Sequence, residues 1–312
     1  MSSKTKTTAT KEEAKPTMVP KLRFPEFREA EVWAEKKLGN EGELYSSLTG
    51  KAGADFDAGE ARFVTYMNVF SNTFVDPKAL RFVDVKDGEN QNAVANGDVF
   101  FTISSETPDE VGMSSVLLED LENCYLNSFC ALFRFSESKR PNPVFTGYLL
   151  RQPSVRAYFT KKAQGSTRFN LSKDAFRSLP LCLPSPNEQQ KIAECLSSLD
   201  FAVAAQARKV HALKIHKKGL MQQLFPREGE TQPRLRFPEF QNAGEWEAKM
   251  LGDVVKSFKT GKLDANAMVE NGQYRFYTCA KNYYQIDHYA FEGEALLVAG
   301  NGAHLGYIHH YI

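Results

Sequence analysis

The stretch that decides the architecture is SPNEQQKIAECLSSLDFAVAAQARKVHALKIHKKGLMQQLF, residues 185–225. It opens with a helix start signal, because Ser185 can cap the helix, Pro186 suits the first helical position and Glu188 completes a capping box. Pro226 follows Phe225 and ends the pattern, since proline cannot continue a helix. The stretch therefore predicts one helix of roughly 39 residues, about 58 Å long at 1.5 Å per residue.

Apolar residues along this helix recur at two heptad positions. One position holds Leu196, Val203, Val210 and Leu224, and the other holds Ile192, Leu199, Leu213 and Leu220. The exceptions are Lys217 and Gln206. This is an a/d seam of about five heptads, which is typical of coiled coils. We expect the seam to pack against another helix, because a rod of this length cannot bury it on one small domain.

The chain also contains a long internal repeat. PKLRFPEF at residues 20–27 recurs as PRLRFPEF at residues 233–240, an offset of 213 residues. Trp33 and Trp246 correspond at the same offset. Further on the offset becomes 196, as a shortened loop would produce, so that GDVFF at 97–101 corresponds to GEALL at 293–297. A repeat of this length is a duplicated domain and not a solenoid unit.

The repeat and the helix together predict the domain organisation. We expect a disordered tail at 1–20, a first domain at 21–184, the long helix at 185–226, a linker at 227–233 and a second domain at 234–312. Residue 312 falls near the equivalent of Leu118 in the first copy. We therefore expect the second domain to be incomplete here, and a second long helix to lie beyond residue 312.

The first domain has the pattern of a mixed α/β or α+β fold. Runs rich in β-branched and aromatic residues, bounded by Gly, Pro, Asn and Asp, predict strands at 62–66, 80–85, 98–103, 114–118 and 129–135. Short helices are predicted at 152–162 and 173–178. The second copy should repeat this fold in part.

Composition agrees with two folded domains. The 312 residues are 42% hydrophobic and 25% charged, which excludes a wholly disordered or collagen-like chain. No apolar run approaches 18 residues, so we expect no transmembrane helix and no membrane partner. The five cysteines show no CxxC spacing, which favours reduced thiols and a cytoplasmic location.

Charge is segregated along the chain although the net charge is only +1. Residues 151–181 carry seven basic residues against one acid, Asp174. Residues 84–122 carry ten acids against one base, Lys86. Such segregation favours a basic face toward an anion such as nucleic acid. Two solvated surfaces with unremarkable partners are the alternative.

Motifs of catalysis are missing from the sequence. It has no Walker A loop, no Asn-Pro-Pro-aromatic tetrad of an amino-methyltransferase and no His or Cys spacing typical of zinc. The glycines around Gly300 do not fit a dinucleotide fingerprint. The sequence therefore predicts a binding protein with no metal and no cofactor of its own.

The best candidate for contact with nucleic acid is KKAQGSTR, residues 161–168. We expect Lys161, Lys162 and Arg168 to neutralise phosphates, because cations supply most phosphate contacts. Gln164, Ser166 and Thr167 have side chains suited to base edges, and Gly165 lets the backbone come close. Lys51, Arg62 or Asn68 could serve instead. The alternative is a polar surface loop before a strand.

Several segments resemble one known family. They are GSTRFNLS at 165–172, LCLPSPNEQQKIA at 181–193, Leu199-Asp200, KKGLMQQLF at 217–225, the segment from Trp33 to Gly39, and GDVFFT at 97–102 followed by Gly112. The chain is similar in these segments to the specificity (S) subunit of Type I restriction–modification enzymes. The resemblance covers about residues 20–312, and residues 165–225 are its most specific part.

The resemblance implies a division of labour among subunits. Two target recognition domains, held apart by an antiparallel pair of long helices, would each contact one half of a bipartite double-stranded DNA site. Methyltransferase (M) subunits would bind S-adenosylmethionine, and restriction (R) subunits would use ATP and Mg²⁺. This chain would bind none of these cofactors and would dock to the M subunit through its long helix.

Two other interpretations are open at this point. The chain could be a truncated adaptor or decoy that homodimerises, or binds the M subunit, through its helix without specific DNA recognition. Half-length relatives that dimerise to rebuild a two-domain subunit are an intermediate case. An autonomous DNA methyltransferase is disfavoured by the missing motifs.

Overall fold

The structure is a computed structural model that describes residues 20–311. The predicted disordered tail therefore lies, up to residue 19, outside the described residues. The chain forms two compact units, residues 1–213 and 214–312, which are described separately. None of the helices in the described part combines the length and apolar composition needed to cross a membrane.

A four-stranded antiparallel sheet carries much of the core of the first unit. Its order is β2 (Gly42–Tyr45), β9 (Cys130–Phe135), β5 (Val99–Thr102) and β7 (Ser114–Val116). All four side chains of β5 are buried. Val99 and Phe101 belong to one core cluster and Phe100 to another, so both faces of this strand are covered. A continuous apolar run is what such a strand requires.

The remaining strands of this unit form one three-stranded sheet and two pairs. The sheet has the order β4 (Arg81–Val83), β3 (Phe56–Val64) and β8 (Cys124–Leu126), in which β3 and β8 run parallel. β1 (Ala34–Lys37) pairs with β11 (Pro180–Leu183), and β6 (Ser104–Ser105) pairs with β10 (Phe169–Asn170). The first pair joins the early and late segments of the domain to each other, and the second joins the segment after α4 to the middle of the chain.

Short helices complete the main core. They are α1 (Leu38–Glu41), α2 (Tyr66–Ser71), α3 (Pro143–Arg151), α4 (Pro153–Lys162) and α5 (Lys173–Arg177). Turns of 3-10 helix occur at Pro25–Phe27, Gly53–Asp55, Pro77–Ala79, Glu137–Lys139, Pro238–Phe240 and Ala265–Ala267. Phe159 of α4 and Phe176 of α5 pack on Phe101, with ring centroids 5.2 to 5.8 Å apart. These aromatic contacts fix α4 and α5 on the central sheet.

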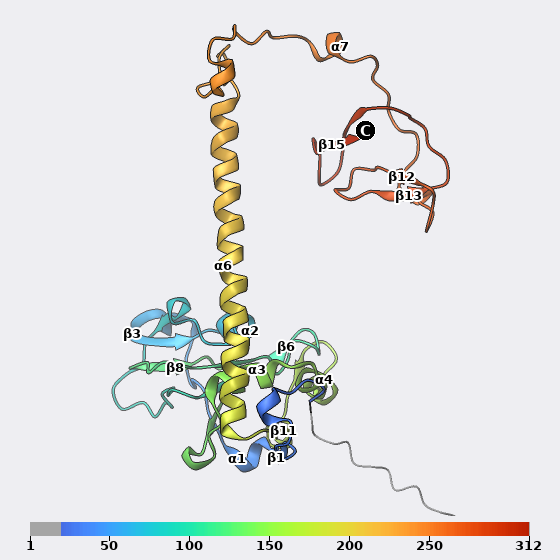
Figure 1. The fold of residues 1–312 in the computed structure, drawn as a ribbon. Helices are drawn as coiled ribbons and strands as arrows, with labels where there is room; N and C mark the ends of the chain where they lie inside the picture. Colours follow the sequence, from blue (N-terminus) through green and yellow to red (C-terminus); the bar gives the residue numbers. More distant parts are fainter. Residues whose placement is uncertain (1–19, 312) are drawn as a thin grey trace, which may run out of the picture. The chain divides into compact units, whose positions relative to one another are not determined.

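α6 (Pro186–Leu224) is an unbroken helix of 39 residues, as the sequence predicts (Figure 1). The Glu188 backbone N–H donates to Ser185 Oγ at 3.4 Å, so the predicted start is confirmed. Only Glu188, Gln189 and Ala193 of the helix are buried. Farther along, the seam is open to solvent: Val203 is 69% and Val210 50% exposed. The described chain therefore leaves most of the seam uncovered.

The second unit has little core of its own. It contains α7 (Leu251–Val254) and two hairpins, β12 (Tyr274–Phe276) with β13 (Tyr284–Ile286) and β14 (Ala295–Val298) with β15 (Ile308–Tyr311). Among its described residues, Ile286 and Ala299 are the buried hydrophobic ones. Its local structure repeats the first unit: β12 matches part of β3 at offset 213, and β14 matches β5 at offset 196.

The fold class and most predicted elements agree with the structure. The five predicted strands correspond to β3, β4, β5, β7 and β9, and the predicted helices correspond to α4 and α5. Sequence reasoning missed α3, although Asn142 caps it and Pro143 opens it. The two units divide within α6 at residue 213. The finer boundaries at 184, 226 and 233 stay predictions.

Candidate nucleic-acid interface

The basic loop, residues 161–168, follows the last turn of α4. Phe159 anchors that turn in the core, and Lys161 and Lys162, the last two residues of the helix, are exposed. The backbones of Gln164 and Asn170 exchange two hydrogen bonds, with N···O distances of 3.0 and 2.8 Å, which close the loop. Between them the exposed residues are Gly165, Ser166, Thr167 and Arg168. The structure thus brings the seven predicted residues of this segment together on the surface.

Gly165 is required by the shape of the loop. Its φ is +138°, and a Cβ at this position would lie 2.0 Å from the carbonyl oxygen of Arg168. A side chain here would force the loop open, because no real Cβ contact is that short. The glycine lets the chain fold back on itself, and the close approach of its backbone to DNA stays a prediction.

Arg168 lies over an aromatic ring that the sequence pattern did not single out. Its guanidinium carbon is 5.6 Å from the centroid of Phe129, and that ring is 52% exposed. The Phe129 N–H donates to Asn127 Oδ1 at 2.7 Å, which fixes the turn that carries the ring. An exposed ring beside a guanidinium is a surface on which a base or sugar can stack. The sequence gives no signal for it, because Phe129 only begins a predicted strand.

A groove adjoins this pair. Its volume is about 560 Å³, and it is lined by residues of the segments 44–51, 128–131 and 171–176. Lys173 on its border is exposed and adds a further cation. Ser128 and Cys130, which line the groove, flank Phe129 in the chain, so the groove is the third part of the candidate interface beside Phe129 and the basic loop.

Two of the seven basic residues counted in the sequence do not belong to this surface. Arg151 donates to four backbone carbonyls, those of Ser114, Val69, Phe70 and Asn72. Desolvation by burial lowers its pKa to about 10. Arg156 donates to the carbonyls of Asp109 and Val111, and burial lowers its pKa as well. These cations hold α3 and α4 on the sheet, so the exposed positive charge is smaller than the sequence indicates.

Acidic residues flank the loop on one side. β10 pairs with β6, and Glu106 and Asp109 follow β6 in an exposed segment. Their charges oppose the approach of phosphate from that side. We therefore expect DNA to approach from the side of Phe129 and Lys173.

Of the alternative residues, Lys51 lines the groove but is already paired with an acid, and Arg62 lies on another part of the first unit. Lys51 Nζ lies 2.6 and 2.5 Å from the two carboxylate oxygens of Glu89, and the lysine side chain is only 6% exposed. Its charge is already neutralised, so it is not free for phosphate. Arg62 lies on β3, and Figure 1 shows β3 and β8 on the opposite side of the first unit from β6 and α4.

The Lys51–Glu89 pair predicts a pH dependence. The hydrogen bond from Lys51 is the main cause that lowers the Glu89 pKa from 4.5 to about 2. Because the folded pKa is depressed, the pair stabilises the fold above pH 4.5, and this contribution is lost as the pH falls toward 2. We expect the melting temperature of the Glu89→Gln variant to depend less on pH between about 4.5 and 2 than that of the parent chain. If the variant loses melting temperature in acid as steeply as the parent chain, the Lys51–Glu89 pair is not the cause of this pH dependence.

Asn68, the third alternative residue, is buried and hydrogen-bonded. The side chain is 2% exposed and lies in the first turns of α2. Its Nδ2 donates to the Asp76 carbonyl at 2.9 Å, and its Oδ1 accepts from the Asp76 N–H at 2.9 Å and from Asn72 Nδ2 at 3.0 Å. Its hydrogen bonds hold the segment after α2, so it cannot read a base edge without unfolding that segment.

The buried setting of Asn68 gives a stability prediction. Asn68→Ala leaves the Asp76 backbone groups without their partner, and we expect the free energy of unfolding to fall by about 1–3 kcal/mol. Urea denaturation measures the change. The affinity for DNA of the folded variant should equal that of the parent chain, and a selective loss of DNA binding at unchanged stability would restore Asn68 as a contact residue.

Comparison with known proteins assigns the family. Residues 30–214 match the Type I restriction modification DNA specificity domain. The chain belongs to this family. The match includes the candidate interface and most of α6. The specificity subunits of this family are non-catalytic, which agrees with the prediction from the sequence.

Curated relatives agree with the family. Over 59 residues the chain is 49% identical to the Type I restriction enzyme EcoDI specificity subunit of Escherichia coli. These residues cover 19% of this chain and 13% of that protein. Over 203 residues it is 26% identical to the putative type I restriction enzyme MjaX specificity subunit of Methanocaldococcus jannaschii, 63% of this chain and 46% of that protein. The matches span less than half the length of either relative.

A solved structure supports the fold of this specificity-domain protein. The S subunit of a Type I restriction–modification system from M. genitalium aligns with a TM-score of 0.50 at 15% identity, over 89% of this chain and 68% of that one. At this identity the likeness bears on the fold alone. It agrees with a mixed α/β domain followed by a long helix and further strands.

Proposed function

We propose that this chain recognises a specific sequence in double-stranded DNA as part of a Type I restriction–modification complex. The observation that carries the proposal is the match of residues 30–214 to a DNA specificity domain, together with the exposed basic loop that those residues form. Lys161, Lys162 and Arg168 would neutralise phosphates. Gln164, Ser166 and Thr167, exposed between them, would contact base edges.

The long helix has a second task in this proposal. Its apolar seam residues are exposed from Leu199 to Leu213, so pairing with another helix would remove that surface from water. The helix would hold two recognition domains at a fixed distance and set the spacer of a bipartite site. The same helix would dock the M subunits, and R subunits would join that assembly in the cytoplasm.

Catalysis belongs to the partners in this scheme. S-adenosylmethionine would bind to the M subunits, and ATP and Mg²⁺ to the R subunits. Within the described residues, no group of three or more His, Cys, Asp or Glu side chains is arranged to hold a metal ion. This chain would select the DNA sequence, and the partner subunits would catalyse methylation and cleavage.

Reconstitution with the M subunit tests the proposal. Light scattering gives the composition of the assembly, and fluorescence anisotropy gives its affinity for duplex DNA. We expect the assembly to bind duplex DNA more tightly than the M subunit alone. An assembly that forms but binds no better than the M subunit alone would contradict DNA recognition by this chain.

A second candidate function is an adaptor without DNA recognition. The exposed seam favours it, because a helix of this kind can homodimerise or bind the M subunit whatever the recognition domain does. In that case light scattering shows a dimer or a complex, and the affinity of the M subunit for DNA does not change. The reconstitution above distinguishes the two functions.

A further inference from the structure

A buried ion pair fixes the start of α6 on the first unit. Arg23 Nε donates to Glu188 Oε1 at 2.8 Å, and Arg23 Nη2 donates to Oε2 at 2.7 Å. The indole N–H of Trp33 donates to the same carboxylate at 3.3 Å. The Glu188 side chain is 1% exposed and that of Arg23 is 7% exposed. The Glu188 carboxylate at the start of the helix thus accepts hydrogen bonds from Arg23 and Trp33, which both belong to the first copy of the repeat.

Two backbone carbonyls orient Arg23 for this contact. Its Nη1 donates to the carbonyl of Ala30 at 2.9 Å, and its Nη2 donates to that of Glu31 at 3.0 Å. These residues lie in the same repeated segment as Arg23 itself, so the segment positions its own guanidinium before the helix adds Glu188.

The second copy of the repeat positions an arginine in the same way. Arg236 is the residue 213 positions after Arg23. Its Nη1 donates to the carbonyl of Ala243 at 2.5 Å, and its Nη2 donates to that of Gly244 at 2.7 Å. Ala243 and Gly244 are the equivalents of Ala30 and Glu31 at the same offset. The two guanidinium groups are therefore held by the same backbone positions of the repeat.

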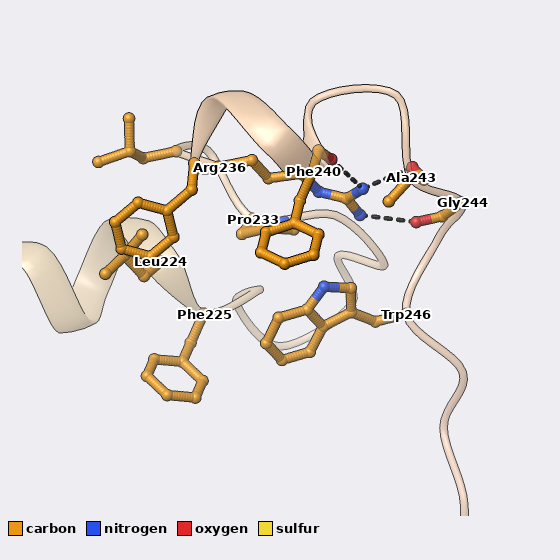
Figure 2. Close-up of a pocket in the computed structure, with 10 residues that line it drawn as sticks. Leu224, Phe225, Pro233, Arg236, Phe240, Ala243, Gly244 and Trp246 are labelled. Atoms are coloured by element: carbon orange, nitrogen blue, oxygen red, sulfur yellow. Dashed lines mark hydrogen bonds between the residues drawn. The ribbon is translucent and has the colours of Figure 1, made fainter.

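Among the described residues, Arg236 has no carboxylate partner like Glu188. Figure 2 shows Arg236 and Trp246, the equivalent of Trp33, in one pocket with the side chains of Phe225 and Phe240. The pocket has a volume of about 460 Å³. Trp246 is 47% and Phe240 56% exposed. In the part of the chain that the structure describes, Arg236 forms hydrogen bonds to carbonyls and no ion pair. The pocket has the donors of the first site without their acceptor.

We propose that the Arg236–Trp246 pocket binds the first turn of a second helix that carries a glutamate three residues after a serine cap, as in Ser185–Glu188. The carboxylate would accept from Arg236 and from the Trp246 indole, as Glu188 does from Arg23 and Trp33. The apolar side chains around the pocket would cover that turn.

A second copy of this chain does not fit the pocket as the donor of the helix. Its own Glu188 is buried and held by its own Arg23, so it would have to give up that ion pair. The occupant is therefore a further helix start of the same chemistry. This inference concerns helix docking and does not depend on whether the basic loop binds DNA.

A labelled peptide tests the proposal on the intact chain. The probe is an acetylated peptide with the sequence of residues 184–199, titrated by fluorescence anisotropy. We expect saturable binding that weakens about tenfold or more with Glu188→Gln in the peptide, because a charge-assisted pair is lost. Arg236→Met in the chain should weaken binding to the same extent. The matched control is Arg234→Met, since Arg234 is exposed and pairs with Glu230 outside the pocket.

Three results would overturn the proposal. They are a dissociation constant weaker than about 1 mM, equal binding of the Glu and Gln peptides, and binding that Arg236→Met leaves unchanged. The peptide substitution does not alter the fold of the chain, so its outcome stands even if the Arg236 variant is unstable. Light scattering that shows a homodimer abolished by Arg236→Met would contradict the choice of occupant.

Discussion

Replacing Lys161, Lys162 and Arg168 together by alanine should weaken duplex DNA binding roughly a hundredfold at about 0.15 M salt. Each phosphate contact contributes about 0.9 to the slope of log K against log salt concentration, so the slope should fall by about 2.7. The three side chains are exposed and form no ion pair within the described residues, so the fold should not change. Fluorescence anisotropy over a series of salt concentrations measures both quantities.

A matched triple variant controls for net charge. Lys78, Lys86 and Lys139 are also exposed, and they lie outside the basic loop and the groove beside it. Changing them to alanine removes the same three charges, yet the salt slope should stay within about one contact of the parent value. Equal losses in the two triple variants would mean that the chain attracts DNA by its overall charge, and the assignment of the basic loop would be wrong.

The double substitution Val203→Glu and Val210→Glu should abolish association through α6. Both side chains are on the seam and are exposed by half or more, so the folded first unit loses nothing by their replacement. In a paired helix, however, the two carboxylates would be buried against apolar residues, which is strongly unfavourable. We expect the affinity for the M subunit, or for a second helix, to fall by at least about a hundredfold.

The control for this variant uses the neighbouring positions. Ala204 and His211 each follow a seam residue and are exposed. Ala204→Glu with His211→Glu adds the same two carboxylates next to the seam and should leave association nearly unchanged. Light scattering and sedimentation velocity measure both variants. Assembly of the seam variant at the parent affinity would show that partners bind elsewhere on the chain.

The long helix could be predicted from local signals because every signal lies within it. The cap at Ser185, the proline at Pro226 and the heptads between them are all close in sequence. The repeat likewise makes Trp246 the equivalent of Trp33 through the offset of 213 residues alone. Elements that depend only on neighbouring residues, such as α4 and α5, followed in the same way.

Burial and pairing could not be predicted, because they depend on residues far away in sequence. Lys51 is neutralised by Glu89, which lies 38 positions later, and Arg23 meets Glu188 across 165 positions. The same applies to Arg151, whose four carbonyl partners lie 37 to 82 positions away. A charge count along the chain treats all such cations as exposed, so it overestimates the basic face.

The exposed aromatic contact illustrates the reverse case. Phe129 begins the strand predicted at 129–135, whose observed counterpart, β9, starts one residue later at Cys130. The ring is exposed beneath Arg168, which comes from a different part of the chain. Ile103 links the two segments, because its N–H donates to the Phe129 carbonyl at 3.1 Å and its carbonyl accepts from the Leu171 N–H at 3.0 Å. No periodicity in the sequence reports these contacts.

Selection from a pool of randomised duplexes tests the central claim most directly. The chain, assembled with its M subunit, is used to retain duplexes at about 0.15 M salt, and the retained DNA is sequenced. The account predicts that fixed bases are enriched, and that the Lys161, Lys162 and Arg168 triple variant retains far less DNA. A retained pool with the same base composition as the starting pool would contradict sequence-specific recognition by this chain.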